Sequence, residues 1–306
     1  MEILNSEEKM IRDNIELQEK KERMYHYTSL DTFFKILLGM KGDHFTFYAG
    51  SVYTMNDYKE MQIGYNCIKK YLPEIEHKLK IGKEDSFLNL SSIPNENKQI
   101  RDNFGKWLIN DDISNFVISF SAKPDILPMW ITYGDNGKGV CLEFSPYIIR
   151  RYYKENMNNN GNLQINNCIY QEKDIKFFLS QQIEKFYNLF LSNVEAKSRK
   201  EPLLKAKYFA TLCAVAGAYI KHYGFEYEKE IRMNLFKHKN EWLFRKNHLN
   251  HHVTYIEAPI PADALTAVIV GPAATYNNVR NSILLSLRSK GISVEPKQSK
   301  IPYRTY

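Results

Sequence analysis

The sequence predicts an α+β fold, in which helices pack around a mixed or split antiparallel sheet. Short segments such as 116–121 and 140–144 alternate apolar and polar residues, as half-buried strands do. Longer segments, above all 174–191 and 201–223, are typical of helices. The length of 306 residues allows one large domain or two small ones.

Composition narrows the class of protein. Hydrophobic residues make up 43% of the chain and charged residues 25%, which is ordinary for a soluble globular protein. The longest apolar run, residues 208–220, has about 13 residues, too few to span a bilayer. The charged beginning of the chain is unlike a signal peptide, and the four cysteines are widely spaced. We therefore expect a cytoplasmic protein with reduced thiols and no membrane partner.

The net charge of +7 permits an acidic partner. Lys and Arg are spread along the chain, however, so the charge by itself gives only weak support for nucleic acid.

The chain divides into a short arm and one domain. Residues 6–23 are charged with a thin apolar stripe, which predicts an N-terminal helical arm over residues 1–23. Residues 24–304 are expected to form a single α+β domain. Within it, residues 58–112 are mostly helical in pattern, with a break at Pro73, so we expect a helical insertion there.

The domain opens with a strand over 24–28 and a helix over 30–38 that begins near Ser29. Along the strand, His26 and Thr28 share one face. A histidine at the end of a strand is most often a hydrogen-bonded structural residue, so the pattern alone favours that role for His26.

The segment 115–146 is predicted to contain two strands joined by an aromatic helical turn and a glycine-rich turn. Ser119 and Ser121 lie on the polar face of its first strand. Trp130 and Tyr133 follow, one helical turn apart. Two polar strand faces with an aromatic pair at their rim indicate the wall of a cleft. The alternative is a hairpin-like core unit whose aromatic residues only pack.

Further elements follow from the same periodicities. The small residues of 201–223, among them Gly217, predict that this helix packs closely against another element of the core. We expect a strand at 45–48, a helix at 147–155, a strand at 163–170, strands at 253–257 and 265–270, a helix at 277–289 and a strand at 292–296. Residues 237–252 are expected to be a polar connection, and its histidines lack neighbouring ligands for a metal site.

Residues 225–235 alternate and predict another strand. Glu226, Glu228 and Glu230 then share one face with Arg232. Like charges on neighbouring positions of one face cost stability, and Arg232 offsets part of that cost. The row is therefore either a functional site or a solvated outer face.

Several short motifs occur together in a recognisable order. They are residues 26–29, 56–60, 119–121, 129–133, 138–144, 227–232 and 271–272. With this set the chain, over about residues 24–304, resembles the prokaryotic family catalogued as domain of unknown function 2971.

The order of the motifs also looks like that of ADP-ribosyltransferase-type folds. In those folds a strand with a His precedes a helix, an aromatic segment follows a Ser-bearing strand, and a late strand carries a catalytic Glu. This sequence offers both Glu228 and Glu230 for one carboxylate, and Trp130 or Tyr133 for one stacking aromatic, so these assignments stay open.

This second resemblance implies an NAD-dependent ADP-ribosyltransferase or NAD glycohydrolase, the kind of enzyme found among bacterial toxins and anti-phage defence effectors. NAD would be the substrate, a protein or nucleic acid the acceptor, and no metal is expected. A carboxylate near the ribose would stabilise the oxocarbenium-like transition state. The implied catalytic residues are Glu230, Glu228 and His26, and the implied NAD-binding residues are His26, Thr28, Ser119, Ser121, Trp130, Tyr133 and Arg232 or Arg304.

Two alternatives compete with the enzyme. One is a non-catalytic nucleotide- or nucleic-acid-binding module, and the other is a metal-dependent nuclease that uses the three glutamates with Asp57. The transferase hypothesis predicts that His26, Ser119, Tyr133 and Glu230 converge within roughly 12 Å on one concave site. It is contradicted if His26 and the carboxylates lie on opposite sides of the sheet.

Overall fold

The computed structural model describes residues 19–52, 59–87, 89, 113–156, 163–196, 202–246, 250 and 252–303. The strands are β1 (Met24–Thr28), β2 (His44–Ser51), β3 (Ile113–Ser121), β4 (Val140–Phe144), β5 (Leu163–Asn167), β6 (Glu230–His238), β7 (Leu243–Lys246), β8 (His252–Pro261), β9 (Leu265–Val270) and β10 (Pro296–Gln298). The helices are α2 (Leu30–Leu38), α3 (Lys59–Lys78), α6 (Leu127–Thr132), α7 (Pro146–Asn156), α8 (Glu172–Ala196), α9 (Pro202–Tyr219) and α10 (Tyr276–Ser289), with 3-10 turns η2 (Tyr223–Glu228), η3 (Lys239–Glu241) and η4 (Ala262–Ala264).

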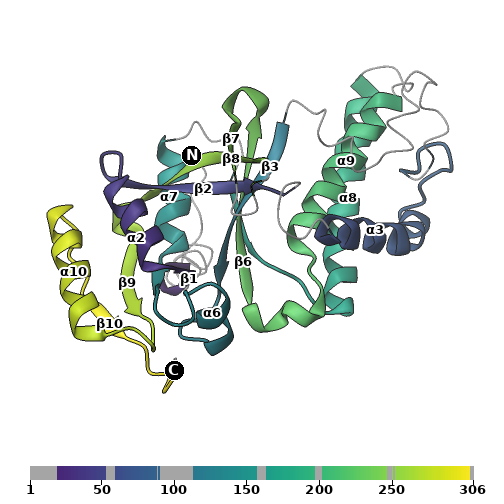
Figure 1. The fold of residues 1–306 in the computed structure, drawn as a ribbon. Helices are drawn as coiled ribbons and strands as arrows, with labels where there is room; N and C mark the ends of the chain where they lie inside the picture. The colour runs from purple at the N-terminus through teal and green to yellow at the C-terminus, as the bar shows by residue number, and fades with distance from the viewer. Residues whose placement is uncertain are drawn as a thin grey trace, which may run out of the picture.

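Over these residues the fold is α+β, as predicted, with a mostly antiparallel open sheet and helices around it (Figure 1). The strand order is β10-β9-β4-β1-β3-β2-β8-β7, and β6 pairs with both β3 and β5. Within the described part of the chain no helix is both long and apolar enough to cross a membrane.

One face of the sheet carries a core that the strand alternation predicts. Phe116, Ile118 and Phe120 of β3 are all buried in it. Helices α2, α7 and α10 cover this face and contribute Phe33, Leu37, Ile149, Tyr153, Ile283 and Leu287 to the same core. The predicted start of α2 is confirmed, because the Ser29 hydroxyl accepts a hydrogen bond of 3.1 Å from the backbone N–H of Thr32.

Helices α3, α8 and α9 form a second core (Figure 1). Phe236 of β6 packs against it, so this helical layer covers part of the opposite sheet face. The predicted close packing of the second long helix is confirmed at Gly217. A Cβ added to Gly64 of α3 would lie 2.5 Å from the backbone nitrogen of Gly217, so the two helix backbones are in contact.

The sheet divides along β3. One edge of β3 pairs with β6 from Ile113 to Ser121. The other edge pairs with β2 at Phe116 and Val117, and with β1 at Ser121. No described strand pairs with the edge between these positions. In this gap the Nδ1 atom of His26 lies 3.1 Å from the carbonyl oxygen of Ser119.

Some predicted elements need correction. The strands of segment 115–146 do not form a hairpin, because β1 lies between β3 and β4 and pairs with both. Pro73 does not break its helix and lies inside α3. The predicted polar connection 237–252 instead contains the end of β6, η3, β7 and the start of β8. The last strand is Pro296–Gln298 rather than 292–296. Of the predicted arm and insertion, residues 1–18, 58, 88 and 90–112 lie outside the described residues.

Candidate functional site

The candidate site lies on the sheet face opposite the core of β3. Residues that pair across an antiparallel ladder share a face, and Ser121 pairs with Glu230 while Ser119 pairs with Arg232. The four side chains therefore form one polar patch on β3 and β6. Within it Ser119 is exposed, whereas the other three are buried.

The predicted carboxylate row is only partly correct. Residues 223–228 form the 3-10 turn η2, and Lys229 has a left-handed backbone with φ of 43°, so β6 begins only at Glu230. The period-2 alternation on which the row depended therefore does not reach Glu226. This residue is half-exposed and accepts hydrogen bonds from Lys229 and Gln171. Since it points to different partners from Glu228 and Glu230, the nuclease alternative loses one of its proposed metal ligands.

Glu228 and Glu230 meet two cations in a buried cluster. Lys221 Nζ lies 2.5 Å from Glu228 Oε2 and 2.9 Å from Glu230 Oε2. The Arg232 guanidinium donates to both oxygens of Glu230, over 2.8 and 3.1 Å. Tyr133 donates its hydroxyl to Glu228 Oε1 over 3.0 Å. Each of the four carboxylate oxygens therefore already accepts at least one hydrogen bond, and two negative charges face two positive ones.

The environment keeps this cluster ionised. Burial by itself would raise the pKa of Glu230, but the charge and hydrogen bonds of Arg232, the charge of Lys221 and a hydrogen bond from Ser119 outweigh it and lower the pKa to about 2. Burial would also lower the pKa of Lys221, yet the two carboxylates raise it above its usual value. Glu230 is thus a carboxylate at every physiological pH and is poorly suited to act as a proton-transferring base.

Two tyrosines converge on Glu228 from neighbouring elements. Tyr133 follows α6 and is 45% exposed, while Tyr227 lies in η2 and is 41% exposed. Burial and the charge of Glu228 raise the pKa of both hydroxyls. The Tyr133 hydroxyl is anchored on Glu228 by its hydrogen bond, and a large part of each ring remains accessible.

Trp130 is not available as a stacking residue. Its side chain is fully buried, its indole N–H donates to Asp125 over 2.8 Å, and its ring meets Tyr27 edge-on at 5.0 Å. The small cluster around it also contains Tyr25, Met129 and Cys141. Of the two aromatic residues, Tyr133 is the one whose ring is accessible.

His26 and Thr28 do not join the site. In β1 they alternate with Tyr25, which pairs with Ser121 of the polar patch, so they belong to the other face of the sheet. The His26 ring packs edge-on against Phe47 and Phe120 of the main core, at 5.2 and 5.6 Å. The predicted convergence of His26 with Glu230 is wrong, because strand register places them on opposite faces. The transferase hypothesis is therefore contradicted in the form that includes His26 in the site.

The remaining predicted residues have structural partners. Arg232 is buried, and besides Glu230 it bonds the carbonyl of Ala218, so it does not point at a pyrophosphate. Ser121 is buried and donates to the carbonyl of Glu228 over 2.7 Å. Asn56, Asp57 and Arg304 lie outside the described residues.

Sequence reasoning missed Lys221, Tyr227 and Tyr170. The Tyr170 hydroxyl accepts the backbone N–H of Glu230 over 3.0 Å. A signal existed for Lys221, because a lysine that directly follows a long apolar run is either solvated or paired with a buried carboxylate. Deciding between these two required the position of β6.

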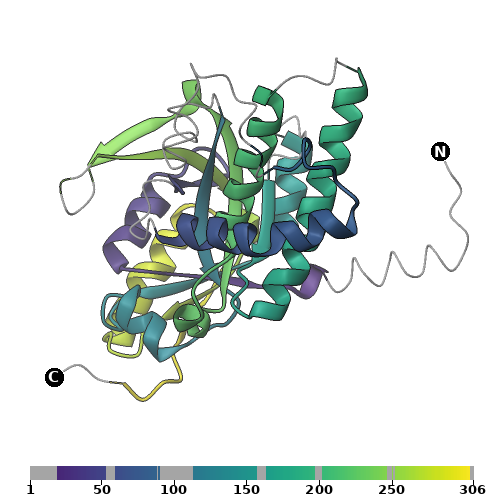
Figure 2. The ribbon, with the colours of Figure 1, turned by 90° about the vertical axis from the view of Figure 1, so that its right-hand side faces the viewer.

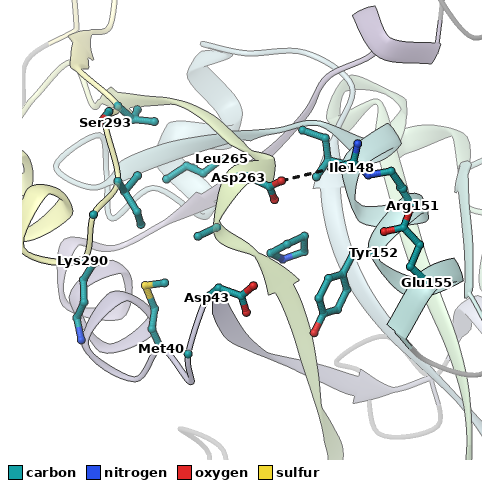
Figure 3. A pocket seen from close by; sticks show the side chains of 16 residues that line it. Met40, Asp43, Ile148, Arg151, Tyr152, Glu155, Asp263, Leu265, Lys290 and Ser293 are labelled. Atoms are coloured by element: carbon teal, nitrogen blue, oxygen red, sulfur yellow. Dashed lines mark ion pairs between the residues drawn. The ribbon is translucent and has the colours of Figure 1, made fainter.

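A separate cavity of 620 Å³ lies near the α2–β2 turn, α7 and residues 290–294 (Figure 3). Its polar lining includes Asp43, Arg151, Tyr152 and Asp263, and Arg151 lies 3.8 Å from Asp263. None of the residues of the carboxylate cluster lines it, so its size does not make it the site of the predicted chemistry.

Comparison with known proteins bears on the predicted resemblance. A family model described as "Protein of unknown function (DUF2971)" matches residues 129–233. No curated protein and no solved structure matches the chain. The matched segment contains Tyr133, Lys221, Glu228 and Glu230, which are the centre of the candidate site. The match supports the first resemblance over residues 129–233, which is about a third of the chain.

Proposed function

We propose that the chain binds a nucleotide at Tyr133 and Tyr227 without cleaving it. The observation that carries this proposal is the pair of half-exposed tyrosine rings near Glu228, of which Tyr133 is anchored by its hydroxyl, beside a carboxylate cluster whose oxygens are all occupied. It favours the binding module over the enzyme that the resemblance to transferases implies.

The tyrosines supply what a nucleotide base needs. A base or a nicotinamide ring stacks on an accessible aromatic face with little demand for sequence or exact orientation. A ring whose hydroxyl is already bonded loses little side-chain entropy when a ligand arrives. The exposed hydroxyl of Ser119, which bonds Glu230, is placed to reach a ribose hydroxyl.

The carboxylates argue against turnover. Glu228 is 3% exposed and Glu230 is 4% exposed, and Lys221 and Arg232 neutralise both. A carboxylate that stabilises an oxocarbenium-like ribose has to contact it, which here requires displacing a buried ion pair. His26, the third residue implied for catalysis, lies on the opposite face.

A second candidate is the NAD-cleaving enzyme with an ADP-ribosyltransferase-like fold, in the role of a toxin or defence effector. One observation favours it, namely that Glu230 is held ionised, with a pKa of about 2, beside the exposed Ser119. In this candidate the C1′–N bond of NAD breaks, its electron pair leaves with neutral nicotinamide, and water or an acceptor adds to C1′ and loses a proton. The function would rest on Glu230 without His26.

Calorimetric titration with NAD tests the binding proposal. We expect measurable binding, and Tyr133→Ala should weaken it by about tenfold or more, since stacking on one base is worth about 1–3 kcal/mol. Tyr133→Phe keeps the ring but loses the anchoring hydroxyl, so it should bind more weakly than the wild type and more tightly than Tyr133→Ala. Phe177→Ala, which removes an exposed aromatic ring on α8, is the matched control. If neither NAD nor AMP binds at millimolar concentration, the proposal is wrong.

Nicotinamide release separates the two candidates. The binding proposal predicts none from the wild type. Release that falls about 100-fold in Glu230→Gln, the usual scale for losing a charge-stabilising group, would establish the enzyme instead. Glu226→Gln changes a half-exposed carboxylate of the same segment and serves as the control, and thermal unfolding shows whether each variant is folded.

A further inference from the structure

A second aromatic surface lies on β2, β7 and β8. The rings of Tyr48 and Tyr255 are 4.7 Å apart, and the guanidinium of Arg245 lies 5.6 Å from each ring centre. Tyr48 is 52% exposed and Arg245 is also exposed. Gly50 of β2 pairs with Tyr255 on one side and with Val117 of β3 on the other. Val117 is on the same face of β3 as Ser119 and Ser121. The two tyrosines and Arg245 therefore lie on the same side of the sheet as the polar patch. We call Tyr48, Tyr255 and Arg245 the aromatic platform.

The chain around the platform is basic. Residues 237–252 contain four Lys or Arg and one Glu, a net charge of +3 within a chain of +7, and also four of its eight histidines. The nearby carboxylates are neutralised: Glu257 lies 2.5 Å from Lys41, and Glu241 lies 2.6 Å from Lys237. Arg245 makes no ion pair with another described residue, so its charge is available to an anion.

The platform is also open to a long ligand. The β7–β8 hairpin extends away from the rest of the sheet (Figure 2), and all four residues of β7 are exposed. Within the described chain β7 pairs with β8 alone, so it forms an edge of the sheet. A flexible polymer can cross this surface without entering a cavity.

We propose that the aromatic platform binds a single strand of nucleic acid. Bases stack on Tyr48 and Tyr255, and phosphates contact Arg245 and the exposed Lys246 beside it. A single strand fits because its bases are free to stack on side chains, whereas those of a duplex stack on one another. This inference goes beyond nucleotide binding at Tyr133 and does not depend on it.

Fluorescence anisotropy with labelled oligo-dT and oligo-U of about 12 nucleotides, a length within known single-strand site sizes, tests the proposal. We expect the wild type to bind both and to bind a duplex of equal length more weakly. Tyr48→Ala should weaken binding about tenfold or more, the effect of losing one stacking ring. Arg245→Ala should weaken it and lower the slope of log affinity against log salt by about 1.

Phe177→Ala and Arg288→Ala are the matched controls, because they remove an exposed aromatic ring and an exposed guanidinium on other elements. They should bind like the wild type, and all variants should keep the wild-type melting temperature within a few degrees. Equal binding of dT and U assigns recognition to base and phosphate, and preference for U adds the 2′-hydroxyl.

The proposal is overturned if the wild type binds neither oligonucleotide at low salt, if it prefers the duplex, or if Tyr48→Ala binds as well as the controls. Because Tyr48→Ala leaves Tyr133 intact, its NAD titration should match the wild type. Loss of oligonucleotide binding with intact NAD binding therefore separates this surface from the nucleotide site.

Discussion

At the residue scale, the His26 side chain supplies a hydrogen bond to a carbonyl of β3 that a neighbouring strand would otherwise bond. The carbonyl of Ser119 can only accept, so Nδ1 of His26 carries the proton and donates to it over 3.1 Å. This bond satisfies a backbone group on the stretch of β3 that no described strand pairs with. Burial lowers the pKa of His26, so the ring is neutral at pH 7.

This position predicts a pH dependence of stability. Because the folded pKa of His26 lies below its ordinary value of 6.5, the unfolded state binds more protons just below that pH. The stabilisation is complete above the ordinary pKa and is lost as the pH falls toward the folded pKa. Urea unfolding should therefore show the wild type losing free energy of unfolding between about pH 7 and pH 5, relative to His26→Asn. Asn offers a donor near Nδ1 and does not titrate, and parallel curves for the two proteins would refute the assignment.

At the scale of elements, the carboxylate cluster joins β6, η2 and the end of α9. Lys221, just after α9, contacts Glu228 of η2 and Glu230 of β6. A buried ion pair contributes little net stability over an apolar pair of the same shape, but removing one partner leaves an uncompensated buried charge. The cluster therefore fixes the position of η2 relative to β6, and with it the position of Tyr227.

From the charges of this cluster we predict that one substitution lowers stability and that a second restores part of it. Glu230→Gln should lower the free energy of unfolding by about 3–5 kcal/mol, because it leaves two buried cations facing one carboxylate. Adding Lys221→Met restores charge balance and should recover part of the loss. Glu226→Gln, on the half-exposed neighbour outside the buried cluster, should stay within about 0.5 kcal/mol. Denaturant unfolding measures all three, and an additive double variant would show that the charges are uncoupled.

The same cluster predicts sensitivity to acid. Glu230 has a folded pKa of about 2 and an ordinary value of 4.5, so its stabilisation is present above pH 4.5 and lost as the pH falls toward 2. The melting temperature of the wild type should fall steeply over this pH interval. In Glu230→Gln the slope should be smaller, and an unchanged slope would contradict the assignment.

The contact between α3 and α9 gives a prediction about packing. A Cβ at Gly64 would meet Gly217 at 2.5 Å, so Gly64→Ala must push the two backbones apart. Overpacking of this kind costs about 1–3 kcal/mol. Gly82→Ala, where a Cβ would meet nothing within 4 Å, is the control. The melting temperatures of the two variants measure the difference, and equal values would contradict the close contact.

At the scale of the whole molecule, the sheet of the described residues separates two cores, and its polar face is accessible there at two places. The exposed places are the tyrosines near Glu228 and the aromatic platform on β2 and β8. A ligand that binds only the folded state stabilises the whole molecule by mass action. NAD at ten times its dissociation constant should therefore add about 1.4 kcal/mol and raise the melting temperature, and Tyr133→Ala should remove this shift. If that variant keeps the rise in melting temperature, NAD binds at a place other than Tyr133.

Local periodicity by itself determined much of the fold. It predicted which residues of β3 and β4 face the core, where α2 begins, and that α9 packs closely through small residues. Each of these depends on residues a few positions apart, so near neighbours in the chain carry the information.

The tertiary structure decided which of these elements lie side by side, and with that the composition of the site. Alternation showed that His26 differs in face from Tyr25, but only the pairing of Tyr25 with Ser121, and of Ser121 with Glu230, showed that His26 is across the sheet from the carboxylate. A register shifted by one residue would have reversed the result. Lys221 reached Glu230 through the packing of a whole helix, and the left-handed Lys229 ended the apparent row of glutamates. Strand neighbours and register depend on contacts between residues far apart in sequence, and those contacts are formed only when the chain folds.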